Sequence, residues 1–417
     1  MKTFSILLTI LLAATLIAQA QTTKTAAVKL SPAERNIAAA RALIDKNPKN
    51  YEAYNGLALA LARRARETSD PNFYKQGEAA LQKSFEISPG NFDGKRIQVW
   101  LLLGKHEFAA ALDEARKLNK RTPDDVMVYG FLTDANVELG NYADAESAAN
   151  WMMKLRGANQ PALTRVAYLR ELFGDLDGAL ELMNMAYQSN SPSQVEDGAW
   201  ILTQMAHLHL AMGDTVQAEK ELQQALAMFP GYHYALGNLA KVRIQQKRYP
   251  EAVALLQQRY DAAPHAENLY ELAVALQLAG RHEDAQKAFA EFEQKSLKET
   301  NIGDNSNHEL IMYYADYANA PEKALSVAQR EIARRRDIHT LDCYAWALYK
   351  NGQYSEARKQ IETALAVGVR DASIFHHAGE IALKAGDKAA AERYLQQAVQ
   401  LNTWGSQQAS NTLVQIR

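Results

Sequence analysis

Residues 341–364 read LDCYAWALYKNGQYSEARKQIETA, and this stretch decides the fold. Before Gly352, apolar and small residues recur at intervals of three and four, at Leu341, Tyr344, Ala345 and Leu348. After Gly352 the same intervals return, at Ala357, Ile361 and Ala364. Such spacing predicts two amphipathic helices. Because glycine readily adopts the positive φ that ends a helix, the stretch predicts a helix–turn–helix hairpin.

The hairpin pattern recurs along the chain, and each copy has a small residue in the first turn of its second helix. These small residues are Gly77, Ala111, Ala145, Ala179, Ala218, Ala252, Ala285, Ala324, Ala357 and Ala391. Successive copies lie 33 to 39 residues apart. Prolines agree with this register, because Pro250 and Pro321 fall at the start of a second helix, where a missing N–H is tolerated. The period predicts a stack of helical hairpins.

This pattern resembles the tetratricopeptide repeat. The copy quoted first follows that family's signature closely, and a second close copy contains Leu202, Met205, Ala206, Gly213, Ala218, Leu222, Ala225 and Pro230. The third and eighth copies depart most, with Asn136 in place of an aromatic residue and Asn319 in place of the glycine. The resemblance covers nearly the whole chain after its first thirty residues. It implies an all-α, right-handed superhelical solenoid of about ten helix–turn–helix repeats.

The register also predicts the organisation of the chain. The expected segments are a signal peptide at 1–20, a polar tether at 21–31, an N-terminal half-repeat at 32–50, repeats 1–4 at 51–197, repeats 5–7 at 198–303, repeats 8–10 at 304–403, and a C-terminal capping helix at 404–417. Extra polar residues at 62–73, 188–197 and 298–307 are typical of loops. The last two stretches predict kinks between the blocks of repeats.

The first twenty residues have the layout of an export signal. Met1 and Lys2 precede an apolar run from Phe4 to Ala18, and small residues frame a cleavage site before Gln21. The run is short for a membrane span, so we expect a cleavable signal peptide and no transmembrane segment after its removal. An uncleaved N-terminal anchor is the alternative. Export places the mature protein in the periplasm or outside the cell.

Composition and motifs give little support for catalysis. The chain has 417 residues, with 46 Lys+Arg against 48 Asp+Glu, which excludes a basic nucleic-acid stripe along its whole length. Its one cysteine, Cys343, excludes an internal disulfide framework. Three His-Glu pairs, at His106, His282 and His308, lack the second histidine that a zinc site on one helix face needs. We therefore expect no enzyme activity, no catalytic residues, no cofactor and no metal.

Stacked repeats leave a long concave surface, which is the usual binding site in such folds. Family resemblance implies that the first helix of each repeat lines this groove. The residues predicted to form a partner-binding groove are Asp134, Tyr168, Trp200, His207, Tyr234, Lys241, Tyr270, Glu309, Tyr313, Asp342, Trp346 and His376. Aromatic side chains there suit capture of a peptide. For Tyr313 and Trp346, packing between repeats is the alternative. The family's carboxylate-binding mode is not expected, because the relevant positions hold no Lys or Arg.

The function we expect is a non-enzymatic protein–protein interaction scaffold of the cell envelope, with a peptide or protein partner in the groove and no nucleic acid. The alternative is an accessory subunit that docks onto an envelope enzyme or an export or assembly machine, for polysaccharide or outer-membrane biogenesis. The basic run Arg330, Arg334, Arg335 and Arg336 is read as a solvated helix end, where cations are favoured by the helix dipole. An anionic envelope partner is the alternative for that run.

Overall fold

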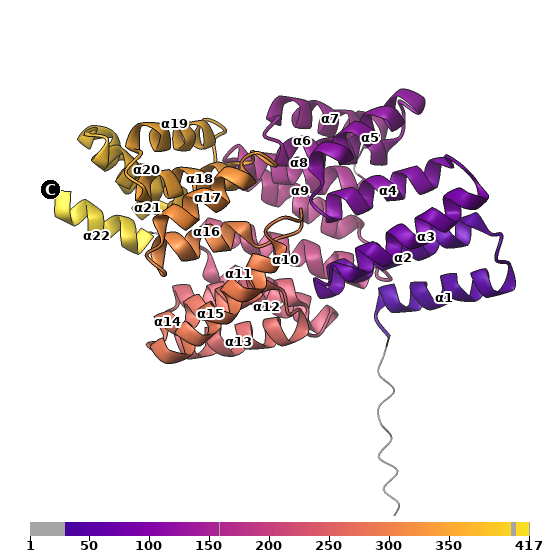
Figure 1. Cartoon of the computed structure of the whole chain (residues 1–417), viewed down its shortest axis with the longest axis horizontal. Coiled ribbons are helices and arrows are strands. Elements are labelled where there is room, and N and C mark those ends of the chain that lie inside the picture. The colour runs from indigo at the N-terminus through magenta and orange to yellow at the C-terminus, as the bar shows by residue number, and fades with distance from the viewer. Residues whose placement is uncertain (1–29, 158, 402–405, 417) are drawn as a thin grey trace, which may run out of the picture.

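A computed structural model describes residues 30–157, 159–401 and 406–416. The signal peptide expected at 1–20 and nearly all of the tether expected at 21–31 lie outside the described residues. Within them the chain forms helices α1 to α22 and no strand. Figure 1 shows these helices stacked side by side along the chain as a superhelical solenoid, which confirms the predicted all-α fold.

One helix precedes the ten hairpins and one follows them. The order is α1 (Pro32–Lys46), then the pairs α2 (Tyr51–Thr68) and α3 (Asn72–Ile87), α4 (Phe92–Gly104) and α5 (Phe108–Arg121), α6 (Val126–Glu138) and α7 (Tyr142–Leu155), α8 (Gln160–Leu172) and α9 (Leu176–Ser189), α10 (Val195–Ala211) and α11 (Thr215–Met228), α12 (His233–Gln245) and α13 (Tyr249–Ala262), α14 (Ala266–Leu278) and α15 (His282–Glu299), α16 (Asn307–Asp316) and α17 (Pro321–Glu331), α18 (Ile338–Lys350) and α19 (Tyr354–Leu365), α20 (Ala372–Lys384) and α21 (Lys388–Leu401), and finally α22 (Ser406–Ile416).

The turn glycines behave as the sequence predicts. Gly140, Gly174, Gly213, Gly280, Gly352 and Gly386 all have positive φ. Where a copy lacks the glycine, His106, Lys247 and Asn319 adopt the same left-handed conformation, with φ between 47° and 58°. In this left-handed conformation the Cβ atom of a non-glycine residue lies too close to the following carbonyl oxygen, which is destabilising. The hairpin geometry therefore persists even in the weakest copies of the repeat.

The extra polar residues partly lengthen helices and partly form loops: most of 62–73 is helical, whereas 190–194 and 300–306 are loops between helices, as predicted. Helices α2 and α15 each have 18 residues and α10 has 17, whereas most other helices have 13 or 14. In α10 the added first turn places Glu196 where it accepts a hydrogen bond from the Tyr232 hydroxyl at 2.9 Å. Its carboxylate also pairs with Arg66 of α2. The extension is helical because its side chains find partners in other repeats.

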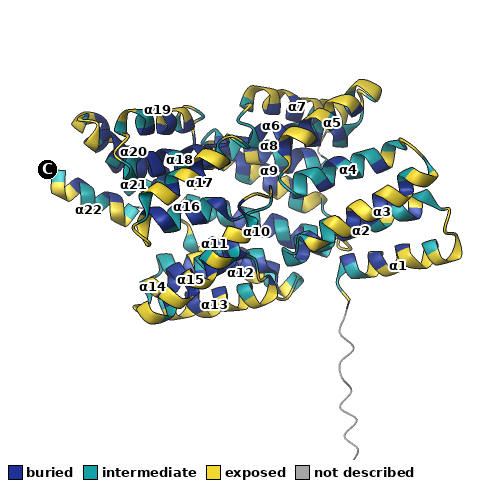
Figure 2. Ribbon diagram, viewed as in Figure 1, coloured by how far each residue is buried: buried dark blue, intermediate teal, exposed yellow. Residues whose placement is uncertain are grey.

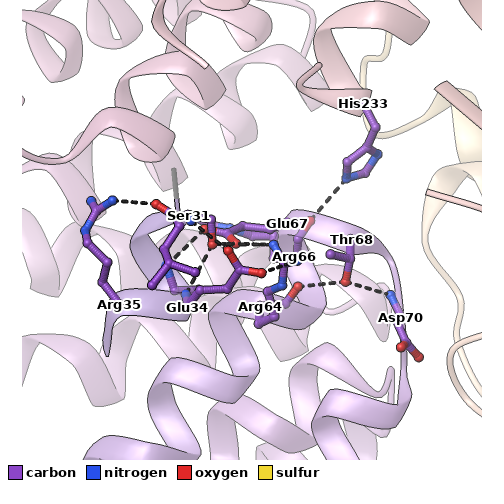
Figure 3. Close-up of polar contacts among 11 residues, drawn as sticks. Ser31, Glu34, Arg35, Arg64, Arg66, Glu67, Thr68, Asp70 and His233 are labelled. Atoms are coloured by element: carbon purple, nitrogen blue, oxygen red, sulfur yellow. Dashed lines mark hydrogen bonds and ion pairs between the residues drawn. The ribbon is translucent and has the colours of Figure 1, made fainter. Parts of the chain in front are cut away.

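The N-terminal helix α1 begins with a capping box formed by Ser31 and Glu34. Ser31 Oγ accepts from the Glu34 backbone N–H at 3.2 Å, and the Glu34 carboxylate accepts from the Ser31 N–H at 2.8 Å. Glu67 of α2 accepts from the Ala33 N–H and, at 2.9 Å, from Arg64 (Figure 3). This network joins the half-repeat to the first hairpin.

Successive turns of the superhelix contact each other directly. The Ile338 N–H donates to the Tyr142 hydroxyl at 2.9 Å, across 196 residues of sequence. Beside it, the Arg336 N–H donates to the Glu138 carbonyl at 2.8 Å. A single apolar cluster contains residues of both turns, namely Val137, Leu169 and Leu172 from α6 and α8 with Ile338, Leu341 and Leu348 from α18. Helices α6 to α8 and α18 to α20 therefore form one packed unit (Figure 1).

A second contact between distant repeats lies nearer the N-terminus. His233 of α12 donates from Nε2 to the Arg66 carbonyl at the end of α2, at 3.1 Å (Figure 3). Arg66 also pairs with Asp197 at 2.9 Å. Burial lowers the pKa of His233 to about 4, so the imidazole is neutral at this contact near pH 7. The solenoid is thus closed at these two places, and the loop at Gly303 also lies against the backbone of Lys105 and His106. Figure 2 shows buried residues on the faces between helices, with exposed residues along the outer sides of α1 and α13.

The contact between turns predicts a difference between two turn glycines of similar conformation. Gly174 has φ +82°, and a Cβ added there would lie 2.5 Å from the Gly368 carbonyl oxygen. Gly280 has φ +73° with open space around it. Both changes to alanine should cost about 1–2 kcal/mol for the left-handed conformation. Gly174→Ala should cost about 1–3 kcal/mol more, because it forces the two turns apart.

The measurement is the urea midpoint of each variant, followed by circular dichroism at 222 nm. Gly280→Ala is the matched control, since it changes the same kind of turn without touching another repeat. Equal midpoints for the two variants would contradict the contact between turns.

Candidate functional site

Three predicted groove residues are exposed on consecutive first helices. Tyr168 of α8 is 37% exposed, and the side chains of His207 on α10 and Lys241 on α12 are 42% and 53% exposed. Each sits at the same register position of its repeat. His207 Nε2 lies 2.8 Å from a carboxylate oxygen of Glu171. These three residues form the accessible stretch of the predicted groove.

Carboxylates surround the ring of Tyr168. Burial of its hydroxyl raises the pKa of Tyr168 well above its ordinary value, and the charges of Glu138, Glu171 and Asp337 add to this effect. Asp337 belongs to the following turn of the superhelix, so the second turn contributes to the surroundings of a first-turn residue. The Tyr168 hydroxyl is therefore a neutral hydrogen-bond donor in an acidic environment.

Asp134 is held by an arginine from the next repeat. Arg165 of α8 donates to both carboxylate oxygens, from Nε at 2.8 Å and from Nη2 at 2.6 Å. The same guanidinium donates to the Gly130 and Pro161 carbonyls. A bidentate pair of this kind fixes both side chains. Asp134 therefore lies in the predicted groove with its carboxylate already occupied.

Trp200 and Tyr234 are half-buried between repeats. Trp200 packs against two apolar clusters, one in α8 to α10 and one in α10 to α12. The Tyr234 ring lies 3.9 Å from the His233 ring and 5.5 Å from the Tyr232 ring. Burial raises the pKa of Tyr234 to about 12. Both residues are closer to packing positions than to a free binding surface.

Aromatic residues from α14 to α16 pack on one another. The Tyr270 ring lies 5.3 Å from Phe292, and the Tyr313 ring stacks on Phe289 at 5.1 Å. Tyr317 completes the group, at 4.7 Å from Phe289. These contacts match the alternative given for Tyr313, which is packing between repeats.

Trp346 is buried in the same manner, with 5% of its surface exposed. Its ring stacks on Tyr349 at 4.7 Å and on His377 at 4.1 Å, and its Nε1–H donates to Asp316 at 3.0 Å. Every face of the indole is thus occupied by the protein. The position that the repeat register assigns to the groove is filled here by contacts with α20.

Asp342 and His376 lie next to Trp346 and are also paired. Asp342 is buried and lies 2.8 Å from His377 Nδ1. Burial opposes charge on His377, but the Asp342 carboxylate outweighs this and raises the pKa of His377. His376 Nε2 lies 3.7 Å from Glu380, a residue that also accepts from Tyr349 at 3.1 Å. The repeats near the C-terminus thus use their polar groove positions for internal contacts.

Glu309 is the exception among the predicted carboxylates, because it forms no ion pair with any residue the structure describes. Burial, together with the charges of Glu267 and Glu271, raises the pKa of Glu309 from 4.5 to about 8. Glu271 itself pairs with Arg259 and lies 3.9 Å from Lys241. Glu309 is therefore the groove position whose charge the fold leaves without a partner.

Arg335 has a role that the sequence did not reveal. Its guanidinium lies 2.9 Å from Glu138 of the preceding superhelical turn and donates to Asp337 at 2.8 Å. It also lies over the Phe108 ring at 5.5 Å. The basic run that includes Arg335 thus supplies one bond between turns. A single sequence carries no signal that pairs residues 197 positions apart.

The described residues contain no cluster of His, Cys, Asp or Glu that could hold a metal ion. Cys343 is buried, and burial raises the pKa of its thiol well above the ordinary value. A protonated, inaccessible thiol is a poor nucleophile. Among the described helices, none is long and apolar enough to cross a bilayer.

The raised pKa of Glu309 predicts a pH-dependent effect of Glu309→Gln. The folded chain retains a proton at Glu309 that the unfolded chain releases between pH 4.5 and about 8. The contribution of this proton to the free energy of unfolding is fully present below pH 4.5, the ordinary pKa of the side chain. It is lost as the pH rises through about 8, the pKa of Glu309 in the folded chain. Glu309→Gln should therefore raise the thermal midpoint near pH 8.5 and leave it almost unchanged near pH 4.5.

Thermal unfolding at several pH values measures this difference. Glu322→Gln is the control, since Glu322 is exposed on α17 and its removal should shift both midpoints alike. A Glu309→Gln effect that is the same at both ends of the pH range would show that Glu309 is ionised normally.

Comparisons with known proteins agree with this geometry. Two segments, residues 209–267 and 345–403, match family models described as tetratricopeptide repeat. No curated protein sequence matches the chain. Among solved structures, the human IFIT1 dimer with m7Gppp-AAAA is 13% identical with a TM-score of 0.52, covering 88% of this chain and 85% of that one.

Two further structures illustrate the range of similarity. A monomeric IFIT1 variant with Gppp-AAAA is 13% identical with a TM-score of 0.51, covering 89% of this chain and 90% of that one. A chain of the APC/C hetero-tetramer Cut9–Hcn1 is 16% identical with a TM-score of 0.47; the match covers 91% of this chain but only 58% of that one. At these identities the likeness concerns the fold. The family models thus identify tetratricopeptide repeats in two segments of the chain, and the helical hairpins of the described residues have the fold of such repeats.

Proposed function

We propose that the protein is a non-enzymatic protein–protein interaction scaffold of the cell envelope, and that a peptide or protein partner binds along its concave face. The observation that carries this proposal is the exposed series Tyr168, His207 and Lys241 on α8, α10 and α12. Tetratricopeptide repeats are interaction modules, and these three repeats present exposed side chains at the position that the repeat register assigns to the groove.

The chemistry of this stretch suits a polypeptide. Tyr168 offers a hydroxyl donor and an aromatic face, and Lys241 offers a cation with most of its length in solvent. Aromatic anchors bring large contact area at low entropic cost. The carboxylates of Glu138 and Glu171 near Tyr168 disfavour a phosphate backbone. We therefore propose a protein partner and no nucleic acid.

A second candidate function is that of an accessory subunit, which would dock its outer surface onto an envelope enzyme or an export or assembly machine for polysaccharide or outer-membrane biogenesis. The exposed Trp151 of α7 favours it. This ring is 45% exposed, stacks on Tyr129 at 6.1 Å, and has the Lys154 ammonium 5.1 Å from its centre. Large exposed aromatic side chains often mark contact sites.

Photo-crosslinking in intact cells distinguishes the two surfaces. A photoreactive phenylalanine placed at Tyr168 or Lys241 should label the partner, whereas the same group at Val216, which is 79% exposed on α11, should not. Lys241→Ala should reduce labelling from Tyr168 several-fold without changing the amount of folded protein.

The same photoreactive group is also placed at Trp151. If it labels a partner there and captures nothing from Tyr168 or Lys241, the partner docks on the outer surface and the groove proposal is wrong. Digestion of the crosslinked material with ribonuclease tests the nature of the partner. A labelled species that ribonuclease removes would overturn the proposal of a protein partner.

The envelope location rests on the layout of residues 1–20 and has its own test. Cleavage after Ala20 predicts a purified chain whose first residue is Gln21, measured by intact mass and N-terminal sequencing. Replacing Ala18 and Ala20 with a bulky residue should block cleavage and leave the precursor attached to the membrane. A mature chain that retains Met1 in the soluble fraction would rule out export by this route.

A further inference from the structure

A cavity of about 590 Å³ lies between α19, α20 and α21, and none of the predicted groove residues lines it. It is lined by Glu362, Leu365, Ala366, Gly368, Val369, Arg370, Phe375, Arg393, Tyr394, Gln397, Gln400 and Leu401. Pockets of this volume are typical of sites for small ligands or short peptide ends. Apart from Phe375 of α20, the lining comes from the second helices of two repeats and the loop before α20, so the cavity opens toward the outer layer of the solenoid.

The floor of the cavity is apolar. Val369 and Phe375 are buried, and Leu365 and Leu401 are packed against the cluster that joins α20, α21 and α22. Such a floor gains stability when an apolar side chain covers it. The cavity therefore offers an apolar ligand group a place to bury its surface.

The rim of the cavity is rich in hydrogen-bond donors that the protein does not use. The side chains of Arg370, Arg393, Gln397 and Gln400 form no hydrogen bond or ion pair within the residues the structure describes. Arg393 lies over the Tyr394 ring at 5.0 Å, which leaves its N–H groups free. A guanidinium carries five donors and is well suited to a carboxylate.

The acidic groups nearest these arginines already have partners. Glu362, which belongs to the lining, pairs with Arg358 at 2.7 Å. Asp387 accepts from the Ala390 N–H at 3.0 Å and from Arg358 at 3.0 Å. Arg358 is thus shared between two carboxylates, and the charge of Arg393 also contributes to the lowered pKa of Asp387. The lining itself contains two arginines and one carboxylate, which leaves an excess of one positive charge.

One of the two arginines is positioned by the contact between superhelical turns. The Cγ and Cδ atoms of Arg370 lie 3.3 Å and 3.4 Å from the point where a Cβ on Gly174 would stand. The preceding loop is held there too, because the Gly368 carbonyl is still closer to that point. The stem of Arg370 therefore packs on the first superhelical turn.

We propose that this cavity binds the C-terminal end of a peptide, with the terminal carboxylate between Arg370 and Arg393 and the last apolar side chain on the floor at Phe375. The amides of Gln397 and Gln400 then bond to the backbone of the peptide, which offers both donors and acceptors. The site is separate from the groove at Tyr168 and Lys241. It also differs from a carboxylate site on the first helices, because its arginines lie on a loop and on a second helix.

The test uses the full chain without its first twenty residues and a set of fluorescent hexapeptides whose last two residues vary among apolar types. Each peptide is made with a free carboxylate and as its C-terminal amide, and binding is measured by anisotropy. The best free acids should bind about tenfold or more tightly than their amides, since a hydrogen-bonded charge pair is lost in the amide. Arg370→Gln with Arg393→Gln should weaken the acids at least tenfold and leave the amides unchanged.

Arg330→Gln is the matched control, because Arg330 is exposed on α17 and outside the cavity. It and Lys241→Ala should leave binding of the acids unaltered, which separates this site from the proposed groove. Circular dichroism verifies that each variant is folded. If no free acid binds more tightly than its amide, or if the double variant binds like the original chain, the proposal is wrong. Displacement of the fluorescent peptide by inorganic phosphate as effectively as by the unlabelled free acid would also overturn the proposal, because the site would then bind any anion.

Discussion

The packing of one superhelical turn against the next is the constraint on which the rest of the structure depends. In an ordinary solenoid each repeat contacts only its neighbours, and stability is a sum of local terms. Here Tyr142 and Ile338 share a hydrogen bond across 196 residues, and Arg335 pairs with Glu138 of the other turn. The repeats around α6 and α8 are therefore linked to those around α18 and α20, and neither group can move away without exposing apolar surface of the other.

This closure divides the first helices into two groups. Toward the C-terminus, Trp346 and Tyr313 are occupied by neighbouring rings, and Asp342 is occupied by His377. In the middle of the chain, Tyr168 and Lys241 keep exposed side chains. The same register position thus holds a buried, packed side chain in one part of the solenoid and a solvent-exposed side chain in another. The proposed concave site is confined to three repeats, and the outer cavity near Phe375 lies in a different part of the array.

Much of the fold could be predicted because its signals are local. The spacing of Leu341, Tyr344 and Leu348 around Gly352 specifies a hairpin without reference to any other part of the chain. The contacts between turns could not be predicted, because nothing near Arg335 in the sequence points to Glu138. For the same reason the register placed Trp346 in the groove, while its burial is decided by His377 in the next repeat. The first turn of α10, from Val195 to Asp197, read as part of a loop, since Arg66, the residue that pairs with Glu196 there, is far away in the sequence.

The register between turns also limits how such a chain can change in length. Gly140 meets Arg336 and Gly174 meets Gly368, so two consecutive hairpins of one turn face two consecutive loops of the next. Gain or loss of one whole hairpin between residues 175 and 335 would shift one turn against the other by one repeat. Gly140 and Gly174 would then face different residues, whose side chains are not shaped for these contacts. A hairpin added beyond α22 or before α1 would leave those pairs intact. Duplication of repeats, the ordinary means by which solenoids grow, would therefore preserve the contacts between turns at either end of the array and disrupt them in its middle.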